Sequence, residues 1–125
     1  MMALVLMTLG GAVGAMFRFV VDAMIRQLWS VRFPVATLII NTTGSSALGL
    51  IAAGVTLGGL NPVWFAALGV GLCGGFTTFS TAMVETVRLL GEHRGLAGLT
   101  YVLGSAGVCV VAAGLGSWLG TVWWS

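Results

Sequence analysis

The stretch GLCGGFTTFST, residues 71–81, decides the fold of this chain. It has two adjacent glycines, Gly74 and Gly75, followed by hydroxyl and aromatic side chains, and it lies in a run from Phe33 to Val84 without Asp, Glu, Lys, Arg or His. An uncharged run of this length is typical of a membrane interior. The glycines predict a break in a membrane-spanning helix. Backbone freed there must face protein, a cavity or an ion, because lipid cannot hydrogen-bond it.

The composition predicts an all-α integral membrane protein. The 125 residues are 58% hydrophobic and 6% charged, whereas ordinary soluble domains are about 25% charged. At about 1.5 Å per helical residue, the chain supplies about four crossings of a hydrocarbon core roughly 30 Å thick. We expect a single four-span membrane domain over residues 1–125, with spans at about 3–23, 34–57, 63–89 and 96–122, the third of them broken.

Several functional classes are disfavoured by the same sequence. The net charge of +2 is too small and scattered for a nucleic-acid footprint, and no nucleophile, base and acid set in the spans points to an enzyme. The N-terminal apolar run lacks a preceding basic region, so we do not expect a cleaved signal peptide. The letters GVGLCG at residues 69–74 match a dinucleotide-binding fingerprint, but that motif requires a soluble βαβ unit.

Glycines four residues apart predict close helix packing. The pairs are Gly10 with Gly14, Gly54 with Gly58, Gly71 with Gly75, and Gly116 with Gly120. So many small faces favour a compact bundle or an oligomer. Cys73 and Cys109 both fall within spans, where we expect small buried side chains and no disulfide.

Polar residues recur every four positions in the second and fourth spans, so each set shares one helix face. The sets are Thr37, Asn41 and Ser45, and Tyr101, Ser105 and Cys109. Hydrogen bonding between helices is sufficient to explain the hydroxyls. Asn41 is different, because a mid-span carboxamide is costly to bury and requires a polar partner or a water-filled path.

Charged residues lie near the expected span ends. Arg18 and Asp22 have a spacing that permits an ion pair, although Arg18 can also extend to lipid headgroups. Glu85, three residues before Arg88, is expected to form a local pair or to anchor the helix at the interface. We expect His93 to be a solvated loop residue, since the chain offers no further metal ligands near it.

Three motifs in order, GAVGAMFRF at residues 11–19, TLIIN at 37–41 and GLCGGFTTFST at 71–81, resemble the CrcB/Fluc fluoride channel family. The resemblance extends over nearly the whole chain. It implies a fluoride-selective channel in the bacterial inner membrane, built as a dual-topology homodimer of antiparallel four-span subunits within membrane lipid. It also implies a structural sodium ion (Na+) at the dimer interface, held by backbone carbonyls that match Gly74 and Thr77, with Arg18 and Gly75 in structural roles.

Fluoride is small and strongly hydrated, so a pore must replace its water with hydrogen-bond donors and positive ring edges. The residues that match this pore are Asn41, Phe79, Ser80, Thr81, Tyr101 and Ser105. The fluoride specificity itself is implied by the resemblance alone.

The chain departs from the family pattern at Ala82, where the family has a second pore phenylalanine one turn after Phe79. Cys109 likewise stands where the family often has serine. In addition, the loops after spans one and three hold Arg26, Arg32, Arg88 and Arg94, which by the positive-inside rule favours one fixed orientation. An alternative is therefore one subunit of a heterodimeric channel with an altered pore.

Two other functional classes fit part of the sequence. A small dual-topology multidrug or guanidinium exporter has a similar length, but it needs a membrane-embedded carboxylate, and the first span has none before Asp22. A structural membrane protein explains the glycine faces and leaves Asn41 and the glycine break without a role.

Overall fold

A computed structural model describes residues 1–29 and 33–125. Among these residues, four helical spans are long and apolar enough to cross a membrane. The first, second and fourth spans are the helices α1 (Met2–Leu28), α2 (Val35–Thr56) and α6 (Gly95–Trp124). The first helix continues past the expected end at residue 23, and an i,i+4 ion pair between Asp22 and Arg26 adds a small stabilisation to its last turns. Arg32 lies outside the described residues.

The third span, Pro62–Gly91, is built from four helical pieces. They are α3 (Pro62–Trp64), the π-helix η1 (Phe65–Cys73), α4 (Gly74–Phe76) and α5 (Phe79–Gly91). The first three pieces run on without interruption, and the helix stops only at Thr77 and Thr78. The broken third span expected from the sequence is therefore present, as a bent span with its interruption just after the glycines.

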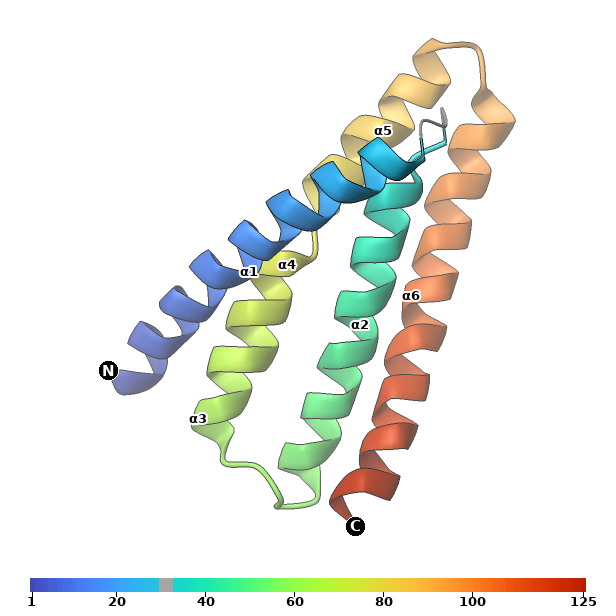
Figure 1. The fold of residues 1–125 in the computed structure, drawn as a ribbon. Coiled ribbons are helices and arrows are strands. Elements are labelled where there is room, and N and C mark those ends of the chain that lie inside the picture. The colour runs from blue at the N-terminus through green and yellow to red at the C-terminus, as the bar shows by residue number, and fades with distance from the viewer. Residues whose placement is uncertain (30–32) are drawn as a thin grey trace.

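The spans alternate in direction and form an elongated bundle (Figure 1). The end of α1, the start of α2 and the α5–α6 turn gather at one end of the bundle, and both chain termini lie toward the opposite end (Figure 1). α1 crosses the third span, while α2 packs mainly along α6.

Glycines create the contact of α1 with the third span and the contact of α6 with α2. Gly10 and Gly14 of α1 lie against backbone atoms of η1, while Gly116 and Gly120 of α6 lie against backbone atoms of α2. A side chain at any of these positions would overlap the facing backbone, so the glycine pairs are packing surfaces, as their spacing predicts. Gly58 is an exception, because it has φ +75° in the turn after α2 and no neighbour within 4 Å. Its role is to permit a turn that L-residues rarely adopt.

Local sequence signals mark the start of the third span and the end of α5. Asn61 caps the third span by accepting a hydrogen bond from the Val63 N–H at 2.9 Å, and Pro62 follows as the first helical residue. The turn after α5 has His93 at φ 55°, with the Arg94 N–H donating to the Leu89 carbonyl at 3.0 Å. This geometry is a Schellman C-cap, in which glycine is the usual residue at the left-handed position.

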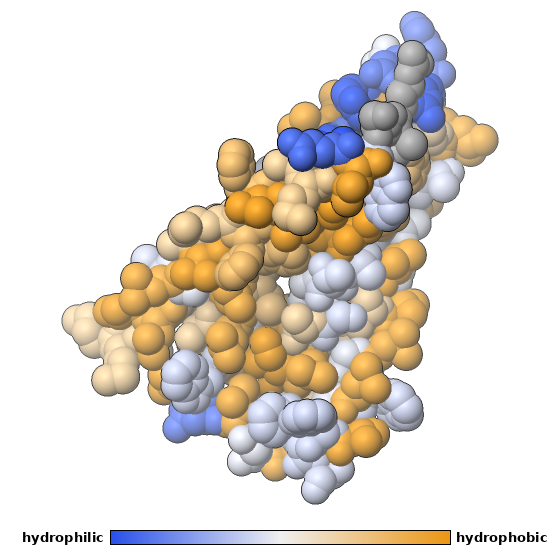
Figure 2. Space-filling view, viewed as in Figure 1, coloured by the Kyte–Doolittle hydropathy of each residue, from blue (hydrophilic) through white to orange (hydrophobic). Residues whose placement is uncertain are grey.

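Hydrophilic surface gathers at the end of the bundle that contains the α5–α6 turn, and apolar side chains cover most of the length (Figure 2). The expected Glu85–Arg88 pair is confirmed at 2.7 Å. The suggested Arg18–Asp22 pair is wrong: Asp22 accepts from Arg26 Nε at 2.8 Å, since Arg18 extends toward the helix break instead.

Candidate functional site

The candidate site surrounds the break in the third span. Thr77 (φ −76°, ψ 159°) and Thr78 (φ −146°, ψ 122°) have extended backbone between two helical pieces. Gly74 is still helical at φ −64°, ψ −39°, so the expectation that the non-helical backbone begins at Gly74 is wrong. The interruption lies at Thr77 and Thr78, whose peptide groups Arg18 and Asn41 contact.

Asn41 of α2 forms two hydrogen bonds with the backbone of Thr78. Its Nδ2 donates to the Thr78 carbonyl at 2.8 Å, and its Oδ1 accepts from the Thr78 N–H at 2.8 Å. The carboxamide thus pairs with an extended residue much as a neighbouring β-strand does. One hydrogen of Nδ2 remains available to another acceptor.

Arg18 of α1 contacts the break from the other side. Its Nη1 donates to the Thr77 carbonyl at 3.4 Å, a long hydrogen bond. The Thr77 N–H and hydroxyl both donate to the Cys73 carbonyl, each at 2.9 Å. The two non-helical residues are therefore held by protein groups from α1, α2 and η1.

Thr78 is a residue of the break that the sequence reasoning did not single out. It is 7% exposed and caps α5, where its hydroxyl accepts from the Thr81 N–H at 3.2 Å. The same hydroxyl lies 3.3 Å from Ser80 Oγ and 3.2 Å from Thr81 Oγ1. The preference of threonine for helix N-caps was the signal in the sequence that could have identified it.

A cavity of about 580 Å³ opens beside the break, between α2, the third span and α6. Three of the expected pore residues line it: Asn41, Phe79 and Ser105. Phe79 is 77% exposed in the subunit, although it lies well inside the third membrane span. Ser45, Cys109 and Ala82 also line the cavity, so the polar faces of α2 and α6 meet here.

The other three expected pore residues lie elsewhere in the subunit. Thr81 lines a second cavity of about 300 Å³ together with Arg18 and Asp22, on the α1 side of the break. Ser80 is exposed on α5. Tyr101 is 1% exposed in an apolar cluster, where its ring meets Phe33 edge to face with centroids 5.6 Å apart.

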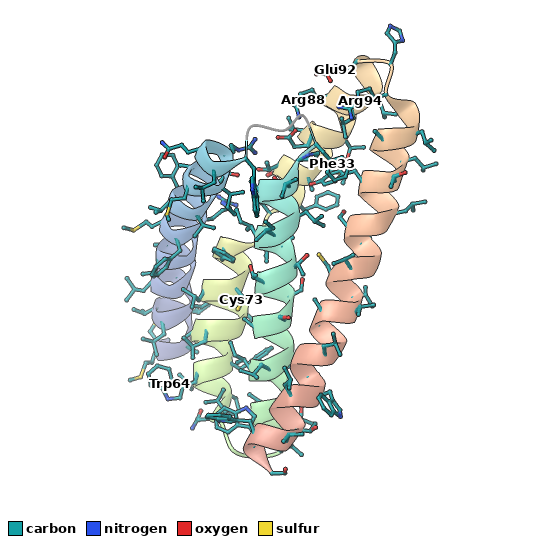
Figure 3. All side chains as sticks on the ribbon, turned by 45° about the vertical axis from the view of Figure 1, so that its right-hand side comes forward. Phe33, Trp64, Cys73, Arg88, Glu92 and Arg94 are labelled. Carbon is teal, nitrogen blue, oxygen red and sulfur yellow. The ribbon has the colours of Figure 1, made fainter. Side chains whose placement is uncertain are left out.

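Ala82 belongs to two environments at once. It is 6% exposed and shares a buried cluster with Leu89 and Tyr101, yet it also borders the large cavity that Phe79 lines. A larger side chain at this position has room only on the cavity side. Cys73 and Cys109 are free thiols, and Cys73 lies between Trp64 toward one end of the bundle and Arg88 toward the other (Figure 3).

The Gly74 carbonyl has lost its helical partner at the break. In an uninterrupted helix it would accept from the Thr78 N–H, which here donates to Asn41. Among the described residues no hydrogen bond to this carbonyl is observed, and Gly74 is exposed with nothing within 4 Å of its Cβ position. Such oxygens suit a hard cation.

An ion-pair network closes the charged end of the bundle. Arg26 of α1 donates to Asp22 at 2.8 Å and to Glu85 of α5 at 3.3 Å, and Arg88 contacts Glu85 at 2.7 Å. Glu85 is 8% exposed, so its carboxylate depends on these two arginines.

Comparisons with known proteins agree with the geometry. The family described as "CrcB-like protein, Camphor Resistance (CrcB)" matches residues 5–117. The fluoride-specific ion channel FluC 1 of Leifsonia xyli subsp. xyli is 46% identical over 112 residues, which is 90% of this chain and 82% of that protein. FluC 2 of Cutibacterium acnes is 42% identical over 125 residues, covering 96% of this chain and 98% of that protein.

This chain belongs to the CrcB/FluC fluoride channel family. Membership explains why its four apolar spans surround a polar break, and it sets the exporter and structural classes aside. CrcB/FluC proteins are channels and not enzymes. The matched relatives are bacterial, and the four candidate spans place this chain in a bacterial membrane.

Proposed function

We propose that this protein conducts fluoride passively through a path that follows the large cavity beside the break. The observation that carries the proposal is the meeting of Asn41, Ser105 and Phe79 on one cavity of about 580 Å³. These are donors and a ring edge of the kind that a strongly hydrated anion requires in place of water. The relatives named as fluoride-specific channels cover nearly the whole chain.

Each lining group retains capacity to bind an anion. Asn41 uses one Nδ2 hydrogen on Thr78 and keeps the second. The Ser105 hydroxyl donates to the Val102 carbonyl at 3.3 Å, a long bond that an anion can replace. The Phe79 ring is largely exposed, so its electropositive edge is accessible.

We assign Ser80, Thr81 and Tyr101 to the same path as further donors. Ser80 and Thr81 face away from the large cavity, so they join the path only where subunits meet. The Tyr101 hydroxyl is buried beside the Thr37 hydroxyl, with no hydrogen bond of good geometry among the described residues. A passing anion or an ordered water would satisfy it.

An antiparallel homodimer completes the site in this proposal. Gly74 and Ser80 are exposed at the break, and the Gly74 carbonyl has no partner in the described part of the subunit. Lipid cannot satisfy such groups, whereas a second protein surface can. Gly75 keeps α4 and α1 in contact, which leaves the opposite face of the break available to the second subunit.

A sodium ion bound by the Gly74 and Thr77 carbonyls of both subunits is part of the proposal. The Gly74 oxygen fits, because it is exposed and unpartnered. Within the described residues, the Thr77 oxygen accepts a single long bond, from Arg18, so a second lone pair remains. When bound, the cation supplies positive charge that holds the two breaks together.

A heterodimeric channel is the second candidate, and two observations favour it. Arg26, Arg88 and Arg94 lie at the same end of the bundle, which the positive-inside rule associates with a fixed orientation. Ala82 also leaves Phe79 without a second ring. A partner with the opposite charge bias would then provide the inverted subunit.

Fluoride efflux from liposomes that contain only the purified chain separates these candidates. We expect efflux on a fluoride electrode and none from matched chloride-loaded liposomes. Efflux that appears only with an oppositely oriented four-span relative supports the heterodimer. If fluoride efflux is absent both from liposomes with the purified chain alone and from liposomes that also hold the relative, although protein is inserted, fluoride conduction is contradicted.

A further inference from the structure

We infer that Asn41 is a positioning residue that keeps the helix break open and leaves the Gly74 carbonyl free for a cation. The hydrogen bonds between Asn41 and Thr78 are observed directly, at 2.8 Å each. The sodium part of the inference rests on the proposed sodium site.

The first step concerns the Thr78 N–H. In a continuous helix this group would donate to the carbonyl of Gly74, four residues earlier. Here it donates to Asn41 Oδ1, and Thr78 is extended and 7% exposed. A buried N–H must have a partner, so the Asn41 oxygen removes the need for the helical bond.

The second step concerns the Thr78 carbonyl. It accepts from Asn41 Nδ2, so both backbone groups of the residue are satisfied by one side chain. Without the carboxamide, two polar groups would be unpaired in a membrane span. The helical bond from Thr78 to Gly74 would then become the favourable alternative.

The third step connects the two ions. Asn41 and Gly74 both line the large cavity, and Asn41 accepts from the Thr78 N–H that would otherwise donate to Gly74. The side chain that we assign to the anion path therefore also determines whether the Gly74 oxygen is available to sodium. Loss of the Asn41 oxygen should weaken cation binding, whereas loss of its N–H alone should not.

The experiment uses the full chain in lipid nanodiscs with three variants. Asn41→Leu removes both hydrogen bonds, and Asn41→Asp keeps an acceptor for the Thr78 N–H. Ser45→Ala is the control, because Ser45 lies one turn along the same face and lines the same cavity. The readouts are the backbone chemical shifts of Thr78, which report whether the residue is extended or helical, and the sodium-induced shift in thermal unfolding, with potassium as reference.

We expect Asn41→Leu to move the Thr78 chemical shifts from extended to helical values and to abolish the sodium-induced unfolding shift. Asn41→Asp should keep the sodium-induced shift, although its fixed negative charge abolishes fluoride efflux. Ser45→Ala should leave the Thr78 chemical shifts and the sodium-induced shift unchanged, whatever its effect on efflux. Unchanged Thr78 chemical shifts in Asn41→Leu overturn the positioning role. A full sodium shift in Asn41→Leu, or none in the unmodified protein, overturns the link to Gly74. If Asn41→Leu does not assemble, loss of the sodium shift in Asn41→Asp overturns that link. Fluoride conduction is tested separately by efflux, so neither result depends on it.

Discussion

Gly75 of α4 lies against the Gly11 carbonyl of α1 so closely that a Cβ at Gly75 would overlap the oxygen. This contact fixes the position of the break relative to the first span, because Thr77 follows two residues later. The overlapped atom is backbone and cannot move like the end of a flexible side chain.

Gly75→Ala should therefore lower the free energy of unfolding by about 1–3 kcal/mol, and Gly75→Val should impair folding or assembly more severely. Thermal unfolding monitored by size-exclusion chromatography measures the effect. Gly104→Ala is the matched control, because a Cβ there has open space, and it should be neutral or stabilising by up to about 1 kcal/mol. Equal stability of the two variants would contradict the packing argument.

Ala82→Phe should raise fluoride efflux several-fold. Ala82 borders the cavity that Phe79 lines, and its other side is buried against Leu89 and Tyr101, so a new ring must enter the cavity. The ring then presents a second electropositive edge one turn after Phe79. Ala82→Leu supplies similar apolar volume without the ring and should not raise efflux. Efflux unchanged or lowered in an assembled Ala82→Phe dimer would indicate a site already packed around alanine.

Tyr101→Phe tests whether a buried core residue also serves the pore. Its hydroxyl is buried beside the Thr37 hydroxyl without a hydrogen bond of good geometry among the described residues, while its ring packs on Phe33. Removing the hydroxyl should change stability by less than about 1 kcal/mol, since only a weak contact with Thr37 is lost. Fluoride efflux should fall if the hydroxyl donates to the anion. Efflux at the original rate would remove Tyr101 from the path and leave it a packing residue.

Glu85→Gln should destabilise the subunit by about 2 kcal/mol, less than the roughly 3–5 kcal/mol of a fully buried pair, because both arginines are partly exposed. The Glu85 side chain is 10% exposed and contacts Arg26 and Arg88, whose side chains are 45% and 47% exposed. Asp22→Asn breaks only one pair, with Asp22 32% exposed, and should cost about 1 kcal/mol or less. Thermal unfolding in the same lipid compares them, and a larger loss in Asp22→Asn would refute this ranking.

His93→Gly should stabilise the turn between α5 and α6 by about 1 kcal/mol, because glycine adopts a left-handed backbone without steric cost. His93 has φ 55°, whereas its neighbour Glu92 has φ −84°. Glu92→Gly should therefore give no gain and serves as the control. The shift in unfolding temperature measures both, and destabilisation by His93→Gly would show that the histidine side chain has a role beyond the turn.

Local patterns in the sequence determined the spans. The uncharged run between Phe33 and Val84 requires an apolar environment, and glycine spacing predicts where helices approach. Asn61 and Pro62 define the start of the third span for equally local reasons. The motifs also identified the family and named Asn41 and Phe79, and the polar face of the fourth span named Ser105; the three residues line one cavity.

Only the tertiary structure decided which groups contact the break. Asn41 bonds to Thr78 across 37 residues and Arg18 to Thr77 across 59, and no spacing rule specifies such distant partners. Those bonds shift the interruption from Gly74 to Thr77 and Thr78, and they direct Arg18 away from Asp22. The division has a physical cause: solvent preference and backbone freedom are properties of each residue, whereas hydrogen-bond partners depend on which helices lie side by side.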